Sequence, residues 1–259
     1  MLLVRNIFLL IALAFYCAGR AQVKMAPLQI TSVDEELFTL GNPPVECEAS
    51  GLSELDTLRV IEIIYNHYPF IKGRDTALVN RINRQVLGYL IRDGERMNRK
   101  KMKFSNCSED RPSSVTTTYS VFCLNNHYLN LCLFQDIEPY GLGNGFAHYA
   151  FPICFDLIKK QPASLSDLLL PQAWDKLIDR MTEELIKNYP DMFLGDDQAQ
   201  TFKNARENLA SNWTYVFDNK ALYFFITLHF GGKVTYEKFT YAYSSEPAIF
   251  RPDFLLQWK

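Results

Sequence analysis

The chain has 259 residues, of which 48% are hydrophobic, 22% charged and 14% aromatic, with a formal net charge of −2. This composition excludes a disordered polymer, a collagen-like chain and a multi-span membrane protein. The slightly acidic balance also argues against nucleic acid as the main partner, because phosphate binding requires a basic surface.

Residues 1–21 have the pattern of a secretory signal peptide. Arg5 precedes an apolar run from Ile7 to Tyr16, and small residues, including Gly19 and Ala21, close the segment. The run is about half the roughly 20 residues that a membrane-spanning helix needs. We expect cleavage after Ala21 and an exported protein, periplasmic or extracellular, with no transmembrane helix in its mature form.

The cysteines set limits on anchoring and on disulfides. Cys17 is not expected to be a lipid-anchor cysteine, because Phe15 and Tyr16 before it are too bulky for the usual small-residue site. The five cysteines that remain after cleavage are Cys47, Cys107, Cys123, Cys132 and Cys154. An odd number leaves at least one thiol unpaired within the monomer, and the pairing stays open. No CxxC pair occurs, which excludes zinc-ribbon and thioredoxin-type sites.

The first predicted elements are a lead-in segment, a strand and a helix. Residues 22–54 are rich in turn formers and form the lead-in. A β-rich run over 58–65 predicts a strand that ends by Pro69. Apolar residues at helical spacing then predict a helix that begins at Asp75 or Thr76.

A β-hairpin is predicted in the middle of the chain. Two β-rich runs, 116–124 and 127–134, flank an Asn-Asn pair that suits a two-residue turn. In that register Cys123 and Cys132 share a face but lie about four rows apart, too far for a disulfide. The other face is the better core candidate, with Phe122, Leu124, Leu129, Leu131 and Leu133.

The rest of the chain mixes helices with further strands. The predicted elements are a strand over 146–157, helices over 164–170, 171–188 and 202–209, and strands over 213–217, 221–230 and 239–243. Strands joined by hairpins favour an α+β fold with a mainly antiparallel sheet and helices packed on it.

A glycine-rich loop before His148 is the most distinctive motif. Gly143, Asn144 and Gly145 expose backbone amides that could hold an anion or a carbonyl, and His148 could act as acid, base or ligand. In the alternative interpretation, which we favour, the glycines permit unusual φ angles between two strands and His148 holds the loop by a hydrogen bond. Binding by these four residues is kept as a hypothesis.

No motif for a cofactor or a metal is present. The four histidines, His67, His127, His148 and His229, form neither HxH nor HExxH, so we expect no metal site and no cofactor. Nucleophile motifs such as GxSxG and SxxK are absent as well. An enzyme alternative remains: a hydrolase of an envelope polymer with His148 and Asp156 in its site.

Aromatic residues are concentrated between 213 and 243. Alternation along strands places about half of them inward. The remainder is a candidate surface for sugar rings or protein partners. Aromatic pairs within a sheet are the alternative interpretation and need no ligand.

Five segments, taken in order, resemble one family. They are Tyr68-Pro69-Phe70-Ile71-Lys72-Gly73, Ala77-Leu78-Val79-Asn80-Arg81-Ile82-Asn83, Tyr119-Ser120-Val121 with Tyr128-Leu129-Asn130-Leu131, Gly145-Phe146-Ala147-His148, and Phe155-Asp156-Leu157 with Ser164-Leu165-Ser166-Asp167-Leu168. The family is the extracytoplasmic domain of unknown function in the RsiV anti-sigma factor and beside the catalytic domain of the PdaC peptidoglycan deacetylase. The resemblance covers residues 55–256, with Phe146 in place of the second glycine of the family's loop.

The resemblance implies an α+β fold of two adjoining parts, residues 55–160 and 161–259. It also implies a non-catalytic module of the bacterial cell envelope, and the domain in RsiV recognises lysozyme. Our first hypothesis is therefore an exported binding module that contacts a lysozyme-like protein or a cell-wall glycan. The hydrolase is the alternative.

Overall fold

The computed structural model describes residues 28–41, 59–91, 113–138, 146–193, 195, 197–230 and 233–258. The predicted signal peptide with Cys17 lies outside the described residues, as do Cys47 and Cys107. None of the described helices has the length and apolar character needed to cross a membrane.

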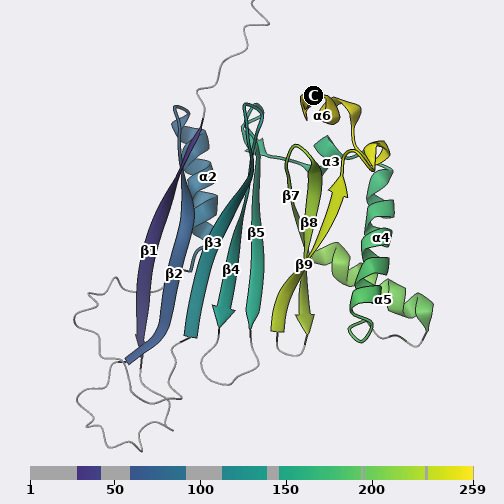
Figure 1. Cartoon of the computed structure of the whole chain (residues 1–259), viewed down its shortest axis with the longest axis horizontal. Coiled ribbons are helices and arrows are strands. Elements are labelled where there is room, and N and C mark those ends of the chain that lie inside the picture. Colours follow the sequence, from purple (N-terminus) through teal and green to yellow (C-terminus); the bar gives the residue numbers. More distant parts are fainter. Residues whose placement is uncertain are drawn as a thin grey trace, which may run out of the picture.

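The described residues form an α+β fold built on one sheet, which confirms the predicted fold class (Figure 1). The strands are β1 (Gln29–Gly41), β2 (Arg59–Lys72), β3 (Ser113–Leu124), β4 (Tyr128–Glu138), β5 (Ala147–Asp156), β6 (Gln161–Pro162), β7 (Trp213–Phe217), β8 (Ala221–Phe230) and β9 (Lys233–Ala242). Their order is β1-β2-β3-β4-β5-β9-β8-β7, with β6 paired to β5. All pairs are antiparallel except β2–β3 and β5–β9.

Helices accompany both ends of this sheet. They are α2 (Thr76–Tyr89), α3 (Leu165–Leu168), α4 (Ala173–Asn188), α5 (Gln198–Ser211) and α6 (Pro252–Leu255), with 3₁₀ turns at Pro247–Ile249 and Leu256–Trp258. In Figure 1, α2 lies along the strands at the left, and α4 and α5 lie beside those at the right.

The sheet carries two main hydrophobic cores. The first joins α2 to β2, β4 and β5 and includes Ile71, Ile82, Val86, Leu129, Leu131, Leu133, Ile153 and Phe155. The second joins α4, α5 and the C-terminal segment to β7–β9 and includes Leu177, Met181, Leu185, Leu209, Phe217, Phe224, Phe239 and Phe254. Between them, β5 and β9 are joined by the pair Ala147–Val234. A boundary near residue 160 between two parts of the chain stays a prediction.

Several local predictions are confirmed. Helix α2 begins after Asp75, whose carboxylate accepts a hydrogen bond from the Leu78 amide at 3.1 Å. Helix α4 lies within the predicted helix over 171–188 and buries Leu177, Ile178, Met181 and Leu185 at helical spacing, and β7 and β8 have the predicted bounds. These elements have strong local signals, namely an N-cap, helical periodicity or aromatic alternation.

The start of the sheet differs from the prediction. The lead-in segment contains β1, an edge strand of 13 residues that the sequence did not indicate. Strand β2 does not end by Pro69 but continues to Lys72. Beyond the pair Asn66–Thr117, β2 has a neighbouring strand only on the β1 side, so the missing N–H of proline is tolerated there.

The central hairpin has a different register. Leu124 pairs with Leu129, and the register shifts between Val121 and Cys123. The Asn125 carboxamide accepts hydrogen bonds from the amides of His127 and Tyr128, which produces a longer turn than the predicted two residues. As a result Leu124 is exposed, while both sides of β4 are buried.

Candidate binding face

His148 lies near the beginning of β5, and its side chain pairs with a carboxylate on the neighbouring strand β4. Its Nδ1 lies 2.6 Å from Oδ1 of Asp136, its cross-strand partner on β4. Both side chains are about half exposed, 46% and 52% respectively. The other residues of the predicted loop site, Gly143, Asn144 and Gly145, lie outside the described residues. Binding by the loop therefore stays a prediction.

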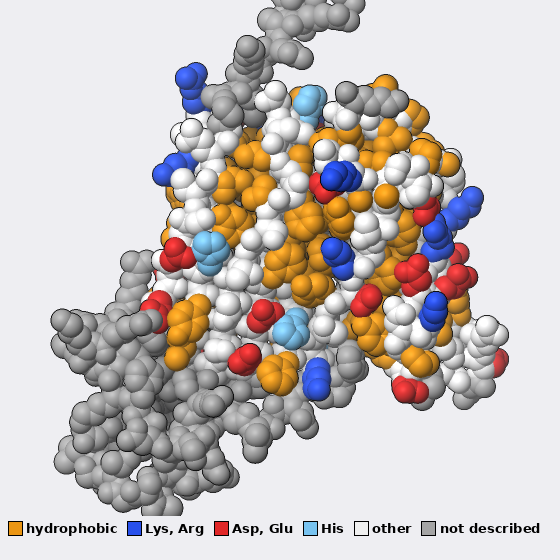
Figure 2. Space-filling model, viewed as in Figure 1, with side chains coloured by type: hydrophobic (Ala, Val, Ile, Leu, Met, Phe, Trp, Pro, Cys, Tyr) orange, Lys and Arg blue, Asp and Glu red, His pale blue; other side chains and the backbone are white. Residues whose placement is uncertain are grey.

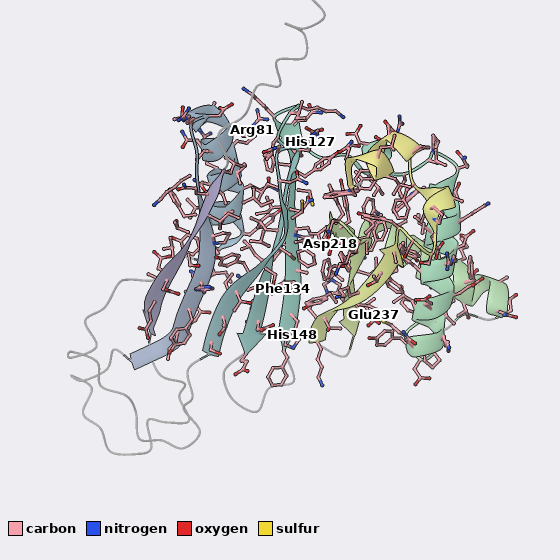
Figure 3. All side chains as sticks on the ribbon, turned by 45° about the horizontal axis from the view of Figure 1, so that its top comes forward. Arg81, His127, Phe134, His148, Asp218 and Glu237 are labelled. Atoms are coloured by element: carbon pink, nitrogen blue, oxygen red, sulfur yellow. The ribbon has the colours of Figure 1, made fainter. Side chains whose placement is uncertain are left out.

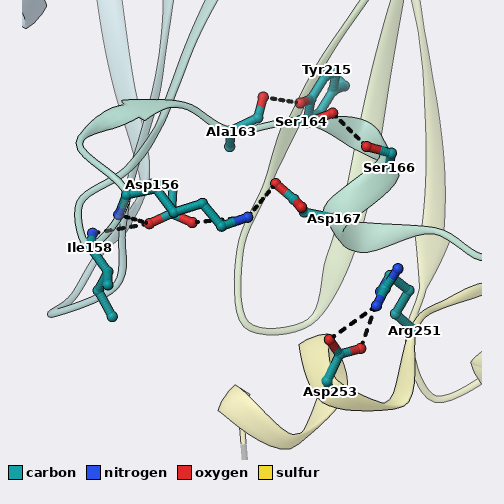
Figure 4. Close-up of polar contacts among 10 residues, drawn as sticks. Asp156, Ile158, Ala163, Ser164, Ser166, Asp167, Tyr215, Arg251 and Asp253 are labelled. Carbon is teal, nitrogen blue, oxygen red and sulfur yellow. Dashed lines mark hydrogen bonds and ion pairs between the residues drawn. The ribbon is translucent and has the colours of Figure 1, made fainter.

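Asp156 lies at the opposite end of β5, where it pairs with Tyr128. Eight residues of a strand separate it from His148, a distance of about 27 Å. Its carboxylate accepts hydrogen bonds from the amides of Ile158 and Lys159 at 3.0 and 2.8 Å, and thereby shapes the turn after β5 (Figure 4). The two residues of the hydrolase alternative do not share a site.

A second histidine–carboxylate pair lies on β1 and β2. His67 Nδ1 is 2.6 Å from Asp34 Oδ1, again across a pair of neighbouring strands. The His67 ring stacks on Tyr119 with centroids 5.2 Å apart, and the Tyr119 hydroxyl lies 2.7 Å from Ser32 Oγ. The sequence did not reveal this pair, because Asp34 belongs to the unpredicted strand β1.

Both pairs lie on the same side of the sheet, which we call the open face. The register places a full row of side chains on it, Glu36, Tyr65, Thr116, Asp136 and His148. A second row has two separate parts, Asp34 with His67 on β1 and β2, and Thr118 with Phe134 and the buried Ala150 on β3 to β5. Helix α2 packs on the opposite side, against Leu129, Leu131 and Leu133. Tyr65 on the open face is 41% exposed, and Asp34, Thr118 and Asp136 are exposed as well.

The open face is polar and acidic. At the left of Figure 2, histidine and acidic side chains lie over the strands, among white backbone and other side chains and some hydrophobic ones. The acids of this face are Asp34, Glu36, Asp136 and Glu138. There is neither lysine nor arginine at positions 32, 34, 36, 63, 65, 67, 114, 116, 118, 120, 134, 136, 138, 148 and 150 of this face. Figure 3 shows His148 near the lower end of the strands and Phe134 further along them.

Three free cysteines lie close together in the interior. Cys123 and Cys154 flank Asn130 across the strands, and Cys132 follows two residues later on the same side of β4. Cys123 and Cys132 are free thiols here, but the predicted separation of about four rows was wrong, because Cys123 pairs with Asn130 next to Cys132. Burial raises the pKa of the Cys123 thiol to about 11 and the pKa of the other two further still. Within the described ranges, no three His, Cys, Asp or Glu side chains are placed to hold a metal ion.

These thiols are expected to resist alkylation while the protein is folded. The thiolate is the nucleophile, so a pKa near 11 in place of about 9 makes Cys123 react about a hundredfold more slowly at pH 8.5. Folding raises this pKa, so the protonated thiol is favoured in the folded state. Its contribution to the free energy of unfolding is therefore present below pH 9 and is lost as the pH rises through 11. Mass spectrometry after iodoacetamide treatment, with a urea-unfolded sample as control, measures the rate at each cysteine. Equal rates in both samples at Cys123 would contradict the buried position.

The described aromatic side chains between residues 213 and 243 line the core of the C-terminal part, and among them no broad exposed surface is formed. Phe217, Phe224, Phe225, Phe239, Tyr241 and Tyr243 are buried, and Trp213, Tyr215, Tyr223 and Tyr236 are partly buried. Many stack against each other, as in the pair of Phe224 and Tyr241 at 6.0 Å. The aromatic pairs therefore match the interpretation that needs no ligand.

No protein-family model matches the sequence, and no curated protein matches it. Structural neighbours are proteins of the DUF3298 family. One, from Bacteroides fragilis NCTC 9343, is 13% identical with a TM-score of 0.48, and the match covers 91% of this chain and 99% of the other. Another, from Pseudomonas aeruginosa PAO1, is 15% identical with a TM-score of 0.46, over 88% of this chain and 97% of the other. Identity and TM-score are too low for either likeness to carry a functional argument.

Proposed function

We propose that the chain is an exported, non-catalytic binding module of the cell envelope that contacts a cationic protein through the open face. The observation that carries this proposal is the charge of that face, where the carboxylates of Asp34, Asp136 and Glu138 lie on exposed positions and no lysine or arginine stands at the neighbouring described positions of the face. The predicted signal peptide and the resemblance to a lysozyme-recognising domain support it.

The arrangement of the face favours binding over catalysis. Its two histidines are already paired with solvent-exposed carboxylates on neighbouring strands. The described groups with shifted pKa values are buried thiols and phenols or members of surface ion pairs, and do not surround one cleft on this face. Acidic side chains spread over several strands give complementarity to a basic protein surface and speed its association.

The test uses the chain from residue 22 onward and lysozyme as a cationic probe. Replacement of the three acids Asp34→Asn, Asp136→Asn and Glu138→Gln should weaken binding at least tenfold, mainly at low salt, because interactions between exposed charges are screened. Titration calorimetry at two salt concentrations measures this change. The matched control, Glu183→Gln with Glu184→Gln and Asp191→Asn, removes the same charge from exposed positions away from the open face and should retain affinity.

Three outcomes would overturn the proposal. Equal weakening in both triple variants would mean that net charge alone determines binding. Binding to soluble peptidoglycan fragments without binding to lysozyme would favour a glycan ligand. Release of new reducing ends or free amines from peptidoglycan would restore the hydrolase.

A further inference from the structure

Strand β1 is the last strand at its end of the sheet. In the described part of the chain it pairs only with β2, and no other strand lies on its outer side. It has 13 residues, about twice the usual strand length. An edge of this length presents a row of main-chain donors and acceptors to any extended segment that approaches it.

The hydrogen bonds of Asn83 show which main-chain groups of β1 point away from β2 toward the outer edge. Asn83 binds both the N–H and the C=O of Ile71, so these groups face away from β1. Ile71 pairs with Ile30, and in an antiparallel pair of this kind the groups of both residues point away from each other. Following the alternation from Ile30, the residues Ser32, Asp34 and Glu36 also turn their N–H and C=O outward. Their side chains lie on the open face.

Two of the usual protections of an edge strand, proline and lysine, are absent from β1, whereas acidic side chains and a bulge near its end are present. Residues 29–41 contain no proline, lysine or arginine, and the pairing with β2 is regular from Gln29 to Thr39. The charged residues of the strand are three consecutive acids, Asp34, Glu35 and Glu36. Pairing of β1 with a second copy of itself would bring six carboxylates together, which disfavours a homodimer through this edge.

We propose that β1 is a docking edge for an extended, cationic segment of the partner protein, which adds a strand to the sheet. Main-chain hydrogen bonds to Ser32, Asp34 and Glu36 supply the pairing. Lysine or arginine at alternate positions of the added strand lies beside Asp34 and extends the open face beyond β1. This inference rests on the proposed function, since it specifies how part of a cationic partner binds.

The experiment uses the acetylated and amidated peptide Thr-Lys-Val-Lys-Thr-Lys-Val-Lys-Thr and the chain from residue 22 onward. Binding should perturb the amide resonances of residues 30–36 in NMR spectra. A peptide N-methylated at alternate residues, which cannot donate along one edge, should bind at least tenfold more weakly when the methylated edge faces β1. Of the two possible methylation registers, one should weaken binding and the other should retain it.

Protein variants provide an independent measurement. Asp34→Lys should weaken peptide binding at least tenfold, whereas Glu183→Lys, an exposed change on α4, should not. The proposal is overturned if both methylated peptides bind like the parent, if the perturbed resonances lie outside β1, or if the protein dimerises through β1. Lysozyme binding to the open face with no peptide binding would remove this inference and leave the proposed function intact.

Discussion

Replacement of Asn83 by alanine should lower the free energy of unfolding by about 2–4 kcal/mol. The Asn83 side chain, from the middle of α2, accepts a hydrogen bond from the Ile71 amide and donates one to the Ile71 carbonyl, both at 2.9 Å. Alanine removes both bonds and leaves two buried main-chain groups of β2 unpaired. Each such group costs about 1–3 kcal/mol.

The effect is large because no strand can take over these bonds. Strands β2 and β3 pair only from Glu62–Ser113 to Asn66–Thr117. Ile71 lies five residues beyond the last pair, and there the carboxamide of Asn83 supplies the donor and acceptor that a neighbouring strand would otherwise provide. Ile71 is itself fully buried, so water cannot replace the lost bonds without opening the core.

Urea denaturation measures the change, and Asn80→Ala on the same helix is the matched control. Asn80 is exposed, and alanine is the better helix former, so this control should be neutral or stabilised by a few tenths of a kcal/mol. A loss below 0.5 kcal/mol in Asn83→Ala, within the range of an ordinary surface substitution, would show that the α2–β2 contact does not depend on the carboxamide.

The sequence predicted those elements whose signals are local. The N-cap at Asp75, the apolar stripe of α4 and the aromatic alternation of β7 and β8 each involve residues that are near neighbours in the chain. The α+β class followed from the hairpin-like spacing of the strands, and the sheet is indeed mainly antiparallel.

Elements that depend on distant partners could not be predicted in this way. Strand β1 has three consecutive acids and a buried Glu35 where alternation would require an apolar residue, so its periodicity is obscured. This segment forms a strand because it pairs with β2 over 13 residues. The register of the β3–β4 hairpin was wrong because the side chain of Asn125 and an irregularity after Val121 cannot be recognised from turn propensity alone.

Only part of the candidate face could be identified from the sequence. His148 was singled out by the glycine-rich motif beside it, but its partner Asp136 is set by the β4–β5 register. The pair of Asp34 and His67 spans 33 positions of the chain, and no local pattern links the two residues. Conversely, His148 and Asp156 belong to consecutive family-like segments of the sequence, but the length of β5 separates them in the structure.

Replacement of Phe254 by alanine should be the most damaging single substitution considered, at about 3–5 kcal/mol. Phe254 lies on α6, close to the end of the chain, and is almost completely buried. Its ring meets Phe217 of β7 and the ring of Tyr243 edge-on, each with centroids 5.5 Å apart. It also approaches Tyr128 of β4 with centroids 6.3 Å apart, so the C-terminal segment contacts both β4 and β7 in the second core.

The comparison with Leu256 isolates the cause of the loss. Leu256 lies two residues further along and is 64% exposed, so Leu256→Ala should change the free energy of unfolding by less than about 0.5 kcal/mol. Guanidinium denaturation followed by tryptophan fluorescence measures both variants, because Trp258 lies 6.0 Å from the Phe254 ring. Since domains are stable by only about 5–15 kcal/mol, Phe254→Ala should unfold at a clearly lower denaturant concentration. Equal midpoints for the two variants would mean that α6 contributes little to the second core, and that β7–β9 with α4 and α5 hold together without the C-terminal segment.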